Sequence, residues 1–202
     1  MTARRLLPAL AVGLVATLLA RRAAAQDPRL ARLEPGTRAL VAALVDSARA
    51  AGLPAEPLVQ RALEGATKRA PGDRIVAAVR RLGADLGRAR EILGSAASLA
   101  ELEAGAAALR AGAAPAVLAE LRRTRRQPLT VPLAVLADLV ASGVPADSAA
   151  TAVLALAATA RDADLVEFRR AVERDIALGA PPAAAASVRL NAAAREARPG
   201  PP

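Results

Sequence analysis

Leucine and valine recur along this chain at the spacing of one helix face, and this periodicity constrains the fold more than any other feature. Apolar residues three or four positions apart lie on one side of an α-helix. Four stretches show the pattern clearly: Leu40, Val41, Leu44 and Val45; Ile75, Val76, Val79, Leu82 and Leu86; Leu133, Leu136, Leu139 and Val140; Leu165, Phe168, Val172 and Ile176. No stretch sustains the apolar–polar alternation of a half-buried β-strand. The sequence therefore predicts an all-α fold.

Glycine and proline recur together between these stretches. The segments 52–54, 143–145 and 179–181 share the pattern Gly-x-Pro, and 112–115 is a looser copy. Glycine ends a helix by adopting the left-handed conformation without steric cost, and proline is favoured in the first turn of the next helix. Helices joined by so short a turn are neighbours, usually antiparallel. We expect eight or nine short helices, in a bundle or in a small array of antiparallel helical hairpins.

The spacing of the later junctions, which start at Gly112, Gly143 and Gly179, fits one hairpin per unit of a helical array. It matches neither the tetratricopeptide signature, which needs aromatic positions that this chain lacks, nor the ankyrin signature. The alternative is that Gly-x-Pro is ordinary loop chemistry in a helical protein. Both interpretations stay open at the level of the sequence.

Capping residues refine the helix boundaries. Thr37, Asp73, Thr130 and Asp162 stand where N-caps are expected, and Ser98 with Glu101 has the spacing of a capping box. The expected helices span 37–51, 55–69, 73–93, 98–111, 115–126, 131–142, 146–160, 163–178 and 182–197.

The first twenty-six residues resemble an export signal. Arg4 and Arg5 precede an apolar run, and the alanines of segment 23–25 supply small residues before Gln26. A signal peptidase accepts this pattern, and the run is shorter than the ~20 residues that span a bilayer. We expect a signal helix cleaved between Ala25 and Gln26. Two alternatives remain: an uncleaved anchor, because arginines stand at 21 and 22, and twin-arginine export. The expected organisation is a signal peptide over 1–25, a flexible linker over 26–36, an all-helical domain over 37–194 and a disordered tail over 195–202.

The composition removes most catalytic chemistry. The chain has no histidine, cysteine, tyrosine or tryptophan, so it lacks the usual zinc ligands, thiol chemistry and the Ser-His-Asp triad. No glycine-rich phosphate loop is present. Phe168 is the single aromatic residue, so alanine, leucine and valine must fill the core, and no disulfide braces it. We therefore predict no catalytic, cofactor-binding or metal-binding residues, no cofactor, and no enzymatic activity.

Oppositely charged residues three or four apart on a helix predict ion pairs. We expect Glu64 to pair with Lys68, the only lysine, and Arg81 to pair with Asp85. Arg170 is expected to pair with Glu167 and Glu173.

Four arginines near one helix end form the candidate anion-binding site: Arg122, Arg123, Arg125 and Arg126. Basic residues at a helix C-terminus stabilise the helix dipole, which accounts for the cluster without any ligand. The functional alternative is binding of phosphate or carboxylate by guanidinium groups. Outside the cytoplasm the candidate anions are lipopolysaccharide, anionic lipid or cell-wall polymers.

These observations predict an exported bacterial protein, periplasmic or extracellular, that acts without catalysis as an interaction or scaffold module of the cell envelope. Its partner would be a protein or an envelope polyanion, and arginine-mediated polyanion binding is the alternative function. No nucleic-acid partner is expected, and contact with the membrane is expected only through an uncleaved signal segment. A helix-turn-helix DNA-binding protein is the remaining alternative if the signal is false.

Overall fold

The computed structural model of the chain describes residues 27–196. Within this range the chain forms one short 3-10 helix and nine α-helices, with no strand. The elements are η1 (Pro28–Arg32), α2 (Pro35–Ala50), α3 (Glu56–Thr67), α4 (Gly72–Leu93), α5 (Leu99–Ala111), α6 (Pro115–Thr124), α7 (Thr130–Ala141), α8 (Ala146–Ala157), α9 (Asp162–Ala177) and α10 (Pro182–Glu196).

The prediction of an all-α fold is confirmed for the described residues. Each of the nine expected helices is present, and every helix end lies within three residues of its expected position. The predicted signal helix, the cleavage position at Ala25 and Gln26, and residues 197–202 of the expected tail lie outside the described residues. In the range 27–196, no helix has both the length and the apolar character needed to cross a membrane.

The chain divides into two compact units, 1–80 and 81–202, where the sequence suggested one helical domain. The described part of unit 1 contains η1, α2, α3 and the beginning of α4. Its core is built from leucine, valine, isoleucine and alanine, with Leu30, Val41, Leu58 and Val79 among the most buried side chains.

The segment that we expected to be a flexible linker contributes to this core. The Asp27 carboxylate accepts a hydrogen bond from the Arg29 backbone N–H at 2.9 Å and so caps helix η1. Leu30 and Leu33 are then buried against α2 and α3. From Asp27 onward the segment is therefore part of unit 1, because its two leucines supply apolar surface that the small aliphatic core can bury.

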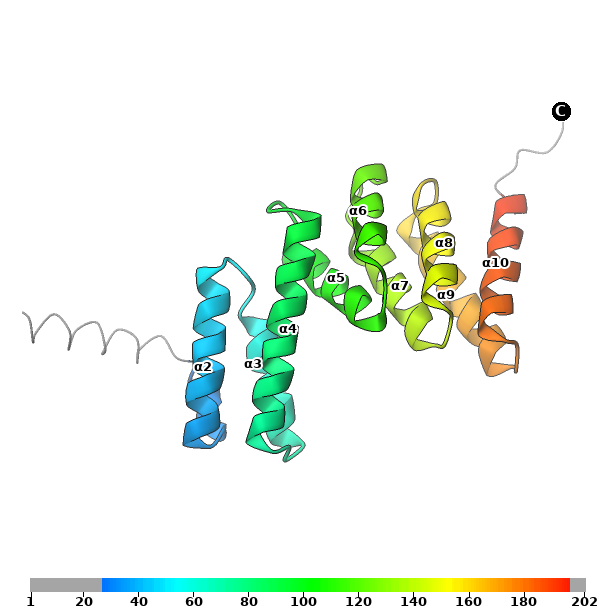
Figure 1. Cartoon of the computed structure of the whole chain (residues 1–202). Helices are drawn as coiled ribbons and strands as arrows, with labels where there is room; N and C mark the ends of the chain where they lie inside the picture. Colours follow the sequence, from blue (N-terminus) through cyan, green and yellow to red (C-terminus); the bar gives the residue numbers. More distant parts are fainter. Residues whose placement is uncertain (1–26, 197–202) are drawn as a thin grey trace, which may run out of the picture. The chain divides into compact units, whose positions relative to one another are not determined.

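Unit 2 arranges its helices in two layers. The helices α5, α7 and α9 contact one another in order, and α6, α8 and α10 do the same (Figure 1). Successive helices from α7 to α10 also pack against each other, which joins the layers. The core between them contains Leu118, Leu133, Leu136, Val153 and Leu165, all fully buried.

The Gly-x-Pro turns share one geometry. Gly52, Gly112, Gly143 and Gly179 all have positive φ, as the sequence predicted. After each glycine, the next N–H bonds to a carbonyl five residues earlier, for example Val144 to Leu139 at 3.0 Å. The glycine N–H bonds to the carbonyl three residues earlier. These paired bonds are the Schellman motif, which satisfies the last carbonyls of the helix.

A fifth turn has the same hydrogen bonds without a glycine. Between α3 and α4, Ala70 N–H bonds to the Gly65 carbonyl and Arg69 N–H bonds to the Ala66 carbonyl. Arg69 stands at the glycine position, with φ of 53°. It is the one non-glycine residue among the described residues in the left-handed region, which a side chain occupies only at a cost.

The helix starts differ from the expected N-caps at four positions. Thr37 is the third residue of α2, Asp73 the second of α4, and Thr130 and Asp162 the first of α7 and α9. These four N-cap predictions are wrong. In α2 the reason is Pro35, whose fixed φ begins the helix before Thr37. The capping box is confirmed, because Ser98 Oγ accepts from the Glu101 N–H and the Glu101 carboxylate accepts from the Ser98 N–H.

Candidate functional site

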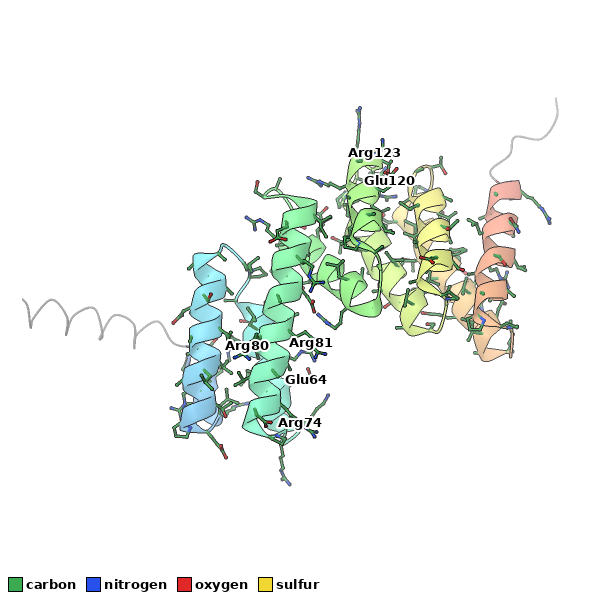
Figure 2. The ribbon with its side chains drawn as sticks, viewed as in Figure 1. Glu64, Arg74, Arg80, Arg81, Glu120 and Arg123 are labelled. Carbon is green, nitrogen blue, oxygen red and sulfur yellow. The ribbon has the colours of Figure 1, made fainter. Side chains whose placement is uncertain are left out.

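The four arginines of the candidate site begin in the last turn of α6 and continue past its end. Arg123 is exposed, and its guanidinium bonds to the Glu120 carboxylate one turn earlier, at 2.6 and 3.0 Å. Figure 2 shows these two side chains together at the end of α6. This hydrogen bond raises the pKa of Arg123 and keeps its charge partly neutralised within its own helix.

In contrast to the exposed Arg123, the side chain of Arg125 points into the interior of unit 2. Its side chain is only 2% exposed. Nη1 donates to the Ala157 carbonyl at 2.9 Å and to the Ala160 carbonyl at 3.3 Å, and Nη2 donates to Asp162 Oδ1 at 2.5 Å. Arg125 therefore caps the C-terminal end of α8 and holds the turn into α9. Its guanidinium is committed to the fold and does not face a ligand.

Arg122 lies beside a buried carboxylate. Its Nη1 is 4.0 Å from Glu101 Oε1, and Glu101 also accepts a hydrogen bond from the Leu129 N–H at 2.9 Å. Burial opposes the charge of Glu101, but the N–H donors of Leu129 and Ser98 outweigh it and lower the pKa of this carboxyl. Glu101 thus ties the start of α5 to the loop before α7, and Arg122 sits at the edge of this contact.

Arg126 is exposed and has no hydrogen-bond or ion-pair partner among the described residues. The four arginines therefore do not form one site. Arg122, Arg123 and Arg126 remain at the surface, whereas Arg125 is a buried structural residue. Sequence reasoning missed this role because Asp162, which receives the Arg125 guanidinium, is 37 residues away.

The predicted ion pairs have mixed outcomes. The pair of Glu64 and Lys68 is confirmed, at 2.6 Å. Asp85, however, pairs with Arg110 of α5 at 3.4 Å, and the predicted pair with Arg81 is wrong. The reason is that Asp85 faces α5 and is almost fully buried there, whereas Arg81, labelled on α4 in Figure 2, is exposed.

The same correction applies in α9. Arg169, and not Arg170, contacts Glu173, at 3.2 Å, and it also reaches Asp138 of α7 at 3.1 Å. Arg169 lies on the side of α9 that packs against α7. Helix spacing correctly identified Glu173 as a partner of an arginine, but it did not distinguish Arg169 from Arg170.

Carboxylates elsewhere do not gather into a metal site. Across residues 27–196, no group of three or more aspartates and glutamates is placed to hold an ion. Asp162 is bonded to Arg125, and Asp164 accepts hydrogen bonds from the Arg161 backbone and side chain.

Unit 2 also has a groove that sequence reasoning did not find. It has a volume of about 820 Å³ and lies along α9 and α10, beside the turn that follows α8. Its buried lining residues, Phe168 and Ala171, are apolar, and its exposed lining residues carry charges of both signs. The lining residues are Leu156, Thr159, Ala160, Arg161, Asp164, Glu167, Phe168, Ala171, Arg174, Arg189, Ala192 and Ala193. The one available signal was Phe168, the only aromatic side chain of the chain.

Comparisons with known proteins give no identification: no family model matches the chain, and no significant match was found among curated proteins or solved structures.

Proposed function

We propose that this chain is an exported, non-enzymatic protein that acts as an interaction or scaffold module of the cell envelope. In this proposal, unit 2 is a small array of antiparallel helical hairpins. The observation that carries it is the two-layer packing of unit 2, in which each layer takes alternate helices along the chain. Stacked helical hairpins of this kind bury a continuous core and leave extended helix faces for partners.

The turns support the same interpretation. Gly112, Gly143 and Gly179 each end a helix with the same pair of backbone hydrogen bonds. The same turn also ends helices in unit 1, so the turn alone does not indicate an array. Its position does support one, because in unit 2 it follows α5, α7 and α9 and so recurs once in each hairpin.

Export is supported by the sequence of the first twenty-six residues. N-terminal sequencing of the protein recovered from fractionated cells tests it. A mature start at Gln26 outside the cytoplasm is the expected result. An intact Met1 in the cytoplasm would overturn the proposed location and favour nucleic-acid binding by the basic helices.

A variant sharpens this test. Ala25→Arg places a large charged residue directly before the cleavage position, where small residues are needed, and should leave the signal attached. A matched change outside the signal, Ala183→Arg on the exposed side of α10, should leave processing intact. Turnover of a peptidoglycan or phosphodiester substrate by the purified protein would overturn the non-enzymatic part.

Polyanion binding is the second candidate, and the structure changes how it is tested. Arg122, Arg123 and Arg126 keep exposed guanidiniums, and Arg126 has no acceptor within the described residues. Replacing these three by glutamine should abolish salt-sensitive binding to anionic vesicles or lipopolysaccharide while helicity is unchanged. Arg125 is left intact, because its loss would disturb the turn after α8. Unchanged binding in the triple variant would refute this candidate.

A further inference from the structure

Helix α9 has two opposite sides with different partners. Arg169 lies on the side that packs against α7, where it reaches Asp138. Ala171 lies in the groove. Arg169 and Ala171 are two residues apart on α9, which corresponds to a rotation of about 200° around the helix axis. The groove therefore faces away from α7. It occupies the position beside α9 where a further helix of the α5–α7–α9 layer would pack.

The groove is suited to receive another helix. Its apolar floor includes Phe168, Ala171 and the two alanines Ala192 and Ala193 of α10. Phe168 and Ala171 are themselves only 6% and 9% exposed, so they form the bottom of the groove, while Ala192 and Ala193 are half-buried beside them. The whole of α9, with its 16 residues, is about 24 Å long at 1.5 Å per residue, long enough to present several turns.

Most charges of the groove are already paired inside unit 2. Arg161 bonds to Asp164 at 3.3 Å. Arg189 bonds to Asp175 at 2.7 Å and lowers the pKa of that carboxyl, an effect to which the charge of Arg174 also contributes.

Glu167 and Arg174 are different. Both line the groove and are exposed, and neither makes a hydrogen bond or ion pair with a residue that the structure describes. They are seven residues apart on α9. Seven residues are nearly two full turns, so both side chains project from almost the same side of the helix.

This spacing makes the face self-complementary. A two-fold axis midway between residues 170 and 171 would set a second α9 antiparallel to the first. Glu167 and Arg174 are equally far from that axis, about 5 Å along the helix in opposite directions. Glu167 of each copy then lies level with Arg174 of the other, and Ala171 lies at the crossing. A two-fold interface requires this reciprocity.

We propose that unit 2 forms a symmetric dimer in which α9 of a second copy occupies the groove, joined by two reciprocal pairs of Glu167 with Arg174. A partner carrying charge of one sign would satisfy only one of these two residues, whereas a second copy satisfies both. The inference goes beyond the proposed function, because self-association requires neither export nor an envelope partner.

Sedimentation equilibrium on the protein, purified as cells process it, tests the dimer. The wild type should show twice the mass of the chain. Glu167→Arg and Arg174→Glu should each weaken the dimer at least tenfold, because each places like charges opposite one another twice in the interface. The double variant E167R/R174E should restore it, because the reciprocal pairs are re-formed with the signs exchanged.

Mixing the two single variants gives the sharpest result. A heterodimer of E167R with R174E has opposite charges at both pairs, so two proteins that are monomeric alone should form a dimer together. Glu103→Arg and Arg126→Glu make the same charge changes at exposed positions outside the groove and should leave the mass unchanged. Far-UV circular dichroism verifies that every variant is folded.

Three results would overturn the proposal. One is a wild type that stays monomeric at about 100 μM, which excludes all but very weak association. The second is a dimer that both single variants leave intact, which would place the interface elsewhere. The third is a double variant or a mixture that stays monomeric, which would show that Glu167 and Arg174 do not face each other.

Discussion

Removing Arg125 should destabilise unit 2 more than removing any neighbouring arginine. In Arg125→Ala, the carbonyls of Ala157 and Ala160 lose their charged donor. A hydrogen bond to a charged group contributes about 1.5–3 kcal/mol to the free energy of unfolding. The bond to Ala160 is the longer of the two, so we take the lower end of this range for each bond. Asp162 is 45% exposed, so loss of the ion pair adds little. The expected cost is about 3 kcal/mol.

Urea unfolding followed by far-UV circular dichroism measures this cost, because the chain has no tryptophan or tyrosine for fluorescence. With a typical m of about 2 kcal/mol/M, the midpoint should fall by about 1.5 M. If the two units unfold in separate transitions, only the transition of unit 2 should shift. Asp162→Asn should cost less than Arg125→Ala, since the two carbonyl bonds remain.

Arg123→Ala is the matched control. Arg123 is exposed and pairs only with Glu120 one turn away, so its loss should leave the midpoint unchanged within error. Equal midpoints for Arg125→Ala and Arg123→Ala would refute the capping role of Arg125, and with it the reason for excluding this residue from an anion site.

Two further predictions concern backbone strain and pH. Arg69→Gly should stabilise unit 1 by about 1 kcal/mol in urea unfolding, because glycine adopts the left-handed backbone conformation without the steric cost of a side chain. Gly143→Arg should destabilise unit 2 for the same reason. A loss of stability on Arg69→Gly would contradict this explanation. The pKa of Glu101 is lowered in the folded state, so its contribution to stability is present above the ordinary glutamate pKa and is lost as the pH falls through the folded value. Glu101→Gln should flatten this acid-side decline in a series of urea midpoints against pH, and an unchanged slope would show that Glu101 does not contribute.

The sequence predicted the helices well because their boundaries are set by local rules. Glycine needs no tertiary partner to take the left-handed conformation, so Gly143 and Gly179 identified their turns directly. The turn between α3 and α4 was also expected, but its left-handed residue was not, because Arg69 stands where the rule looks for glycine. The starts of helices were less certain, since Pro35 and a polar side chain such as Thr37 compete to begin the same helix.

The roles of charged residues could not be predicted by the same reasoning, because they depend on contacts between helices distant in sequence. Arg169 and Asp138 are 31 residues apart, and Arg110 and Asp85 are 25 apart. Spacing on one helix identifies which residues share a face. It does not identify which face meets another helix, and the groove forms only once α10, which lines it, has packed beside α9.

These contacts also change the meaning of the basic composition. The formal charge of +9 suggests a surface for polyanions. Yet several arginines bond to carboxylates on other elements or turns: Arg29 to Glu56, Arg110 to Asp85, Arg125 to Asp162, Arg169 to Asp138 and Arg189 to Asp175. A core of alanine, leucine and valine, without disulfides, gives helices few bulky side chains to fix their register. A planar guanidinium that bonds a carboxylate at a defined position supplies part of that specificity. Among the described residues, these five arginines therefore join elements of the fold, whereas Arg126 and Arg174 have no internal acceptor and are open to partners.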